Sequence, residues 1–120
     1  MIVNIKPLSV NQVWQGRRFK TPKYKAYEKE MLLKLPNINI DIKALLRVDI
    51  TFGYSTRASD IDNGLKPFLD CLQKKYGIND NKIYNLNVVK EIVKKGEEFI
   101  KFSIKELWIN KLVYAIALKI

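Results

Sequence analysis

The 120-residue sequence contains no histidine and only one cysteine, Cys71. Without imidazole groups, Ser-His and Cys-His nucleophile pairs and histidine-bound zinc sites are excluded. A single cysteine forms neither an internal disulfide nor a thiolate metal cluster, and we therefore expect a cytoplasmic location. Any catalysis must rely on carboxylates, lysine, tyrosine or a metal ion held by oxygen ligands.

The sequence also lacks a long apolar run. No stretch approaches the roughly 20 residues that span a bilayer, and the first residues lack the basic and apolar regions of a signal peptide. We expect no membrane association. With 48% hydrophobic residues, the chain is expected to form one globular domain over residues 1–107, extended by an apolar segment at 108–120.

Acidic residues are scarce relative to basic ones. The chain has 22 Lys and Arg against 12 Asp and Glu, giving a net charge of +10. This excess favours a polyanionic partner, above all nucleic acid, through phosphate contacts and counterion release. The alternative is a ribosome-like or simply lysine-rich protein.

A polar, basic stretch follows Pro7 and ends at Thr21. Its basic residues alternate with aromatic ones, and the segment contains Trp14, Arg17, Arg18, Phe19 and Lys20. Such a loop can place cations on phosphates and an aromatic ring on a base. The alternative is a surface loop anchored by Trp14 in the core, and the two interpretations are compatible.

Two helices and four strands are predicted. Thr21-Pro22 is a helix start, Pro36-Asn37 ends that helix, and Gly77 ends a second one. The expected elements are a strand at 2–6, a helix at 22–35, a strand at 44–54, a helix at about 65–76, a strand at 82–95 and a strand at 99–107. Lys94 to Glu97 is expected to form a hairpin turn between the last two strands. The order β-α-β-α-β-β predicts a mixed α+β domain with the helices on one face of a small sheet.

Asp60 and Asp62 lie between the predicted strand 44–54 and the second helix. If this stretch is extended, both carboxylates point to one side, about 6.6 Å apart. Converging carboxylates suit Mg²⁺, which activates water and polarises a phosphoryl oxygen. Asp80 is a candidate third ligand, and Lys66 is placed to neutralise charge on a phosphate or leaving oxygen. The alternative is that the aspartates only cap the helix and that 79–81 is a plain polar turn.

The spacing of these residues resembles the RusA family of Holliday junction resolvases. The matching residues are Asp60, Asp62, Asn63, Lys66, Asp70, Leu72, Asn79, Asp80, Ile83 and Lys90. Pro7, Asn11 and the basic loop before a tyrosine-bearing helix are also similar to the family's N-terminal part. The resemblance spans roughly residues 3 to 107.

The resemblance implies a homodimeric, Mg²⁺-dependent endonuclease that cuts four-way DNA junctions in recombination and repair, often encoded by prophages. By motif, Asp60, Asp62 and Asp80 would be the catalytic, metal-binding acids and Lys66 the catalytic lysine, with Asp70 in a supporting role. The expected DNA contacts are Trp14, Arg17, Arg18, Lys20, Arg57 and Lys90.

The chain departs from the family pattern at two places. Asn79-Asp80 stands where some members carry two aspartates, and residues 56–59 contain one base, Arg57, where some carry a run of arginines. Junction contacts are thus expected to depend more on Arg17, Arg18 and the lysines of the first predicted helix. Two other hypotheses stay open: a basic DNA-binding module without catalysis, and a prophage remnant that folds but no longer cuts.

Overall fold

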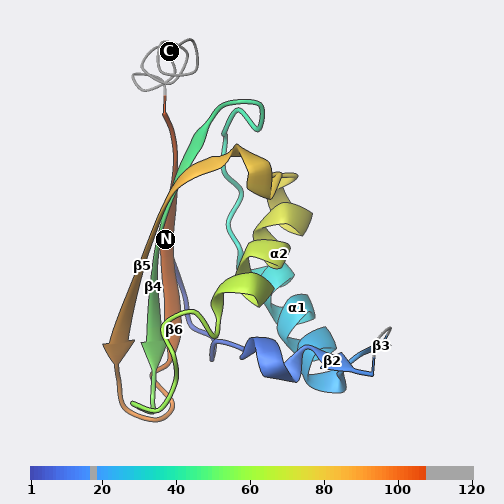
Figure 1. Ribbon diagram of the computed structural model, residues 1–120, viewed down its shortest axis with the longest axis vertical. Coiled ribbons are helices and arrows are strands. Elements are labelled where there is room, and N and C mark those ends of the chain that lie inside the picture. Colours follow the sequence, from blue (N-terminus) through green and yellow to red (C-terminus); the bar gives the residue numbers. More distant parts are fainter. Residues whose placement is uncertain (17–18, 108–120) are drawn as a thin grey trace, which may run out of the picture.

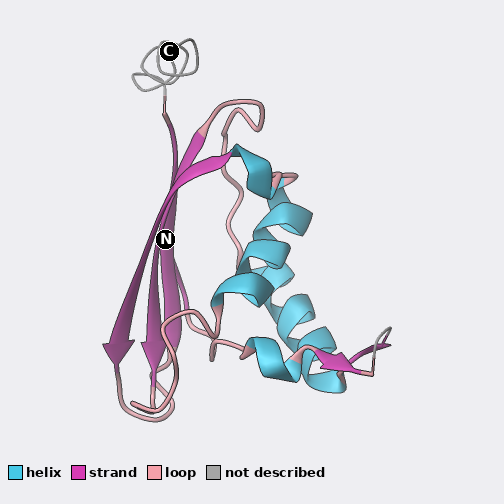
Figure 2. Cartoon of the chain, in the orientation of Figure 1, coloured by secondary structure: helices cyan, strands magenta, loops and turns pink. Residues whose placement is uncertain are grey.

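The computed structural model describes residues 1–16 and 19–107, and consists of a four-stranded sheet with two helices on one face (Figures 1 and 2). The elements of this sandwich are β1 (Ile2–Val3), α1 (Pro22–Lys34), β4 (Leu46–Tyr54), α2 (Leu65–Tyr76), β5 (Ile83–Ile92) and β6 (Phe99–Glu106). Short 3₁₀ turns and a small hairpin complete it: η1 (Val10–Gln12), β2 (Trp14–Gln15), β3 (Phe19–Lys20) and η2 (Asp80–Lys82). The predicted α+β class and the order β-α-β-α-β-β are confirmed.

The sheet has the strand order β1-β6-β4-β5, with β4 in its centre. β5 pairs with β4 in parallel and β6 pairs with β4 antiparallel. The predicted hairpin between the last two strands is therefore wrong, because β5 and β6 lie on opposite sides of β4. The connection crosses the end of β4, where the Val93 N–H donates to the Tyr54 carbonyl at 2.8 Å. Residues 93–98 are long enough for this, because two strand spacings amount to only about 10 Å.

The core lies between β4, β6 and the two helices. Every second residue of β4 from Leu46 to Phe52 is buried, as the alternating sequence predicted. The Phe68 ring of α2 packs edge-on against Phe52 and Phe102, with centroid distances of 6.2 and 5.3 Å. Aromatic pairs in this geometry add to the free energy of burying their surface, so α2 is fixed firmly on β4 and β6.

α1 begins and ends where its sequence indicated. The Thr21 side chain accepts a hydrogen bond from the Tyr24 N–H at 3.1 Å, and Pro22 is the first helical residue. The helix ends at Lys34, just before Pro36. The buried residues of α1 are Tyr24, Tyr27 and Met31, which lie at helical spacing and place one face of the helix against the core.

α2 ends at Gly77, whose φ of 73° lies in the left-handed region that glycine adopts without strain. The helix crosses from the end of β4 to the start of β5, which makes these strands parallel. This crossover puts the residues between β4 and α2, including both predicted aspartates, beside the start of the helix.

The first strand is shorter than predicted. β1 covers Ile2 and Val3 alone, paired with β6. The Ile5 N–H donates to the Val3 carbonyl at 3.0 Å, so the chain turns at Asn4 and leaves the sheet. Within the described ranges, no helix has the length and apolar composition needed to cross a bilayer. The apolar segment predicted at 108–120 lies outside the described residues.

Candidate functional site

The segment from Asp60 to Gly64 is a pair of turns. The Asn63 N–H donates to the Asp60 carbonyl at 3.1 Å, and the Leu65 N–H donates to the Asp62 carbonyl at 3.0 Å. The stretch is therefore not extended, and the carboxylate separation expected for an extended Asp60–Asp62 segment does not apply. These hydrogen bonds arise because α2 begins only three residues after Asp62, so the chain must already be curving there.

Neither aspartate caps α2. Gly64 occupies the cap position, and no side chain makes a capping hydrogen bond there. Asp60 and Asp62 are both exposed. Across residues 1–16 and 19–107, neither carboxylate makes a hydrogen bond or an ion pair. The capping alternative is thus wrong for this helix, and both carboxylates are available to a ligand.

A hydrogen bond from the backbone fixes the end of this turn on the core. The Gly64 N–H donates to the Tyr54 hydroxyl at 3.0 Å, in a buried position. A Cβ atom on Gly64 would lie 2.9 Å from that hydroxyl and 3.1 Å from the Phe52 ring. Burial raises the pKa of Tyr54, and the nearby Asp62 carboxylate raises it further. The phenol is therefore a neutral group that accepts a hydrogen bond beside the aspartates.

Lys66 joins two separate parts of the predicted motif. Its ammonium donates to the Asp70 carboxylate at 2.8 Å and lies 3.8 Å from the Asp80 carboxylate. The hydrogen bond to Asp70 raises the pKa of Lys66, and the charges of Asp70 and Asp80 add to this effect. Lys66 is therefore cationic and is held between two acids. Asp70, which was expected to have a structural or supporting role, lies one helical turn from Lys66.

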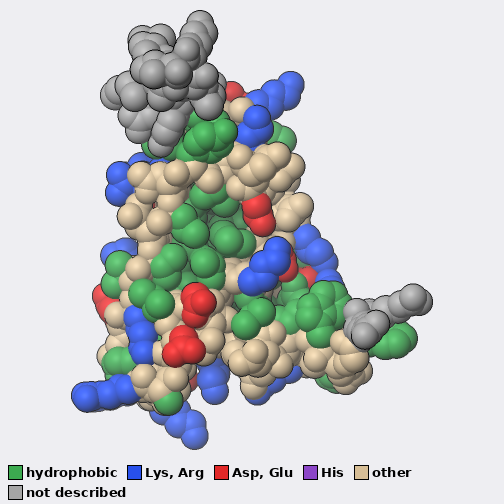
Figure 3. All heavy atoms as spheres, in the orientation of Figure 1, with side chains coloured by type: hydrophobic (Ala, Val, Ile, Leu, Met, Phe, Trp, Pro, Cys, Tyr) green, Lys and Arg blue, Asp and Glu red, His purple; other side chains and the backbone are tan. Residues whose placement is uncertain are grey.

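Lys66 and Asp62 also line one open hollow on the surface. This hollow of about 260 Å³ is bordered by Asp62, Lys66 and three apolar side chains: Val10, Leu65 and Leu69. Figure 3 shows this face of the molecule, where hydrophobic side chains fill the space between β5 and α2 and acidic and basic ones lie at its borders. Asp62 thus borders the same hollow as the Lys66 side chain, and Asp80 forms an ion pair with the Lys66 ammonium.

Asp80 begins the turn η2, and the neighbouring Asn79 caps that turn. The Asn79 side chain accepts from the Asn81 N–H at 3.2 Å, so its predicted role in a polar turn is confirmed. The Asp80 carboxylate contributes no capping hydrogen bond and faces Lys66. One residue therefore shapes the turn, while the other presents its charge.

Metal binding can be judged from the donor groups present. In the part of the chain that the structure describes, no three acidic or cysteine side chains form a ready group for one metal ion. Mg²⁺ does not need such a group, because it commonly uses one or two carboxylates together with waters and substrate phosphates. Asp60 and Asp62 offer two uncommitted carboxylates two residues apart. The donor set fits Mg²⁺.

Lys90, predicted as a DNA contact, forms hydrogen bonds with backbone carbonyl groups. Its ammonium donates to the carbonyl oxygens of Arg57, at 3.0 Å, and of Ser59. Lys90 belongs to β5 and is paired with Phe52 in the sheet. It therefore connects the sheet with the loop before Asp60. The side chain of Arg57, also a predicted DNA contact, is exposed in that loop.

Two of the predicted DNA contacts of the N-terminal stretch, Trp14 and Lys20, lie on the strands β2 and β3. Trp14 is 53% exposed, so the hypothesis that it anchors the loop in the core is wrong. Its ring forms a T-shaped pair with the Tyr24 ring, at a centroid distance of 6.4 Å. The Lys20 ammonium is bound by Glu28 at 3.1 Å and lies over the Tyr24 ring. Arg17 and Arg18 lie outside the described residues.

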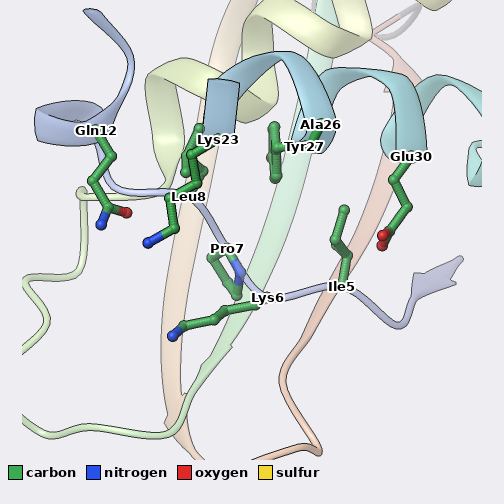
Figure 4. A pocket seen from close by; sticks show the side chains of 9 residues that line it. All are labelled: Ile5, Lys6, Pro7, Leu8, Gln12, Lys23, Ala26, Tyr27 and Glu30. Atoms are coloured by element: carbon green, nitrogen blue, oxygen red, sulfur yellow. The ribbon is translucent and has the colours of Figure 1, made fainter. Parts of the chain in front are cut away.

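Two further hollows adjoin the N-terminal segment. One, of about 220 Å³, lies between residues 5–8 and α1 and is mostly apolar, with Lys23 and Glu30 at its margins (Figure 4). The other, of about 370 Å³, is lined mostly by polar residues, among them Asn11, Gln12 and Asn63. No role was predicted for Gln12 from the sequence. The resemblance to the resolvase family included Asn11 and Asn63, and Gln12 is the residue directly after Asn11.

Comparisons with known proteins add no family to this description: no protein-family model matches the chain, and no curated protein matches it in sequence at a significant level. The resemblance to junction resolvases is therefore carried by the motif residues themselves.

Proposed function

We propose that this protein is a structure-selective endodeoxyribonuclease that cleaves four-way DNA junctions by Mg²⁺-assisted phosphodiester hydrolysis, in DNA recombination and repair. The observation that carries the proposal is the position of Lys66. Its ammonium lies 3.8 Å from the Asp80 carboxylate and borders the same hollow as Asp62. A cation between acids that are far apart in sequence is expected where a phosphate and its counterions bind.

In this proposal Asp60 and Asp62 hold the metal together with waters and substrate phosphates, while Asp80, the third predicted ligand, is paired with Lys66. When bound, Mg²⁺ lowers the pKa of water and offsets the charge that develops on the phosphate. The free carboxylates of Asp60 and Asp62 also suit a second task, which is to accept the proton of the attacking water. Lys66 then neutralises negative charge on the leaving oxygen. The raised pKa of Lys66 supports this role, because the group stays cationic at neutral pH.

The charge of the chain and its exposed aromatic groups support DNA as the substrate. A net charge of +10 attracts a polyanion to the acidic site. Trp14 and Phe19 are 53% and 69% exposed on the small hairpin, where they are available to stack on bases. Such an aromatic surface beside basic residues suits DNA with unstacked bases, which a junction offers at its centre.

We further propose that the active form is a homodimer in the cytoplasm. Resolution of a four-way junction requires two cuts in opposed strands, so two sites related by a two-fold axis match the symmetry of the substrate. A monomer would nick one strand and release a branched product.

The test is a four-way junction labelled on each strand in turn and incubated with the protein, with and without Mg²⁺. Paired, metal-dependent nicks in opposed strands, absent from a linear duplex of the same sequence, are the expected result. A mobility shift without nicking would instead support a DNA-binding module or an inactive remnant. Binding should weaken steeply with salt in every case, because the electrostatic contribution does not depend on catalysis.

A further inference from the structure

The cavity beside the aspartates has two walls from distant parts of the chain. Residues 6–12 form one wall and residues 54–63 form the other, around a volume of about 370 Å³. The Val10 N–H donates to the Asn63 carbonyl at 2.8 Å and holds the walls together. Asp62 borders the hollow of Lys66, and the next residue, Asn63, borders this cavity.

Three carboxamide side chains, of Asn11, Gln12 and Asn63, border this cavity. Within the described ranges, none of these three side chains makes a hydrogen bond to another residue. Figure 4 shows the Gln12 side chain at one side of the apolar hollow under α1, so Gln12 borders both hollows. The donors and acceptors of these amides are therefore available to a ligand.

The charges at the cavity disfavour a phosphate. Lys6 supplies one cation and Glu98 one anion. The Glu98 carboxylate already accepts from the Ser55 hydroxyl at 2.9 Å and the Gly96 N–H at 2.7 Å, so it is fixed in place. A fixed carboxylate repels a phosphate, whereas paired amide donors and acceptors match the hydrogen-bonding edge of a nucleobase. Pro7 and Tyr54 also line the cavity.

We propose that this cavity binds the nucleobase next to the scissile phosphate and that Asn11 and Gln12 thereby determine the sequence preference of cleavage. The proposal rests on the proposed function, because it takes the neighbouring acids as the reaction site. The volume of the cavity, about 370 Å³, lies within the range of small-ligand pockets, roughly 300–1,000 Å³. A base enters such a cavity only when it is unstacked, which costs least at an unpaired or branched position.

The test uses the full chain with Asn11→Ala, Gln12→Ala and the double substitution. Four labelled junctions, differing only in the base pair beside the crossover, are titrated without divalent metal and followed by fluorescence anisotropy. The same junctions are then cleaved with Mg²⁺. The wild type is expected to prefer one base by at least about 5-fold, and the double variant to reduce this to less than about 2-fold.

Gln73→Ala is the matched control, because Gln73 is an exposed carboxamide on α2 outside the cavity. It should keep the wild-type preference, and all variants should keep the wild-type melting temperature. An unchanged preference in the double variant, or no preference in the wild type, overturns the cavity proposal alone. A third outcome is that the wild type binds one base preferentially, the double variant loses this preference, and the wild type cleaves no junction. That outcome overturns the proposed function and supports the base site. Absence of both binding and cleavage overturns both.

Discussion

The ammonium of Lys90 donates a hydrogen bond to the carbonyl oxygen of Ser59, the residue directly before Asp60. It also donates to the Arg57 carbonyl at 3.0 Å. A side chain of β5 thus fixes the loop that carries the first aspartate of the candidate site. Its neighbour in the sheet, Phe52, is completely buried, so the fixed point belongs to the core.

Lys90→Met should therefore impair cleavage more than binding. Loss of both hydrogen bonds releases the backbone before Asp60, and a misplacement of about 1 Å can cost about 100-fold in rate. Single-turnover cleavage of pre-bound junction measures the rate, and anisotropy measures the affinity. Lys105→Met, at an exposed position of β6, is the control and should cut normally.

The opposite pattern would support the direct DNA contact predicted for Lys90. In that case Lys90→Met would leave the cleavage rate of bound junction unchanged. The slope of log affinity against log salt would then become less steep by about one, as for one lost phosphate contact.

Asp62→Asn should lower cleavage by about 100-fold or more while junction binding stays equal or becomes tighter. The substitution removes a metal ligand and also an acid that faces phosphate. The size and polarity of the side chain are retained, so the fold should not change. Asp41→Asn, at an exposed position far from the motif in sequence, is the control. A variant at Asp62 that cuts at the wild-type rate would show that the site is elsewhere.

Trp14→Ala should weaken junction binding by about 10-fold and leave stability nearly unchanged. Stacking on a base contributes about 1–3 kcal/mol, whereas the ring is 53% exposed in the folded protein and forms a T-shaped pair with Tyr24. The comparison is Leu33→Ala, which removes another exposed apolar side chain, 79% accessible, from α1. If the tryptophan variant melted well below the leucine variant, Trp14 would be structural.

Glu28→Gln should destabilise the fold by about 1 kcal/mol. Glu28 is only 15% exposed and binds Lys20 at 3.1 Å and Lys74 at 2.7 Å, so it connects α1 with the hairpin and with α2. Burial alone raises the pKa of Glu28, but hydrogen bonds from Lys74 and Lys20 outweigh it and hold the pKa below its usual value. The side chain therefore stabilises the fold through its charged form.

The pH dependence follows from the lowered pKa of Glu28. Its stabilising contribution is complete above the glutamate pKa of the unfolded chain and is lost as pH falls through the lower pKa of the folded state. Melting curves between about pH 6 and about pH 3 should therefore bring the variant and the wild type together at the acid end. Glu30→Gln is the matched control, because its pair with Lys34 is about half exposed and contributes only about 0.3 kcal/mol.

Local signals made the helices predictable. Thr21 with Pro22 defined the start of α1, and Gly77 the end of α2, because capping depends on neighbours in sequence. The strands that pair with β5 and β6 could not be predicted from such local signals. A short turn-like sequence at 94–97 suggests a hairpin, but β4 takes both strands as partners. That outcome depends on where α2 lies on the sheet.

The residues of the candidate site also differ in how far they could be predicted from the sequence. The spacing of Asp60, Asp62 and Lys66 is local, and the sequence brought these residues together in one hypothesis. The contact of Lys66 with Asp80 depends on the path of the chain after Gly77, and the bond from Lys90 to Ser59 depends on strand register. Such contacts join residues that are brought together only by tertiary packing.

The hydrogen bond from Gly64 to Tyr54 connects the turn of the aspartates with the last residue of β4. Because that bond is buried, the Gly64 amide exchanges its proton for deuterium only when the end of the central strand opens. It should therefore exchange as slowly as the interior of the sheet, although it lies only two residues from the exposed Asp62. The turn that carries the two aspartates and the central strand then form one cooperative unit, which folds and unfolds together.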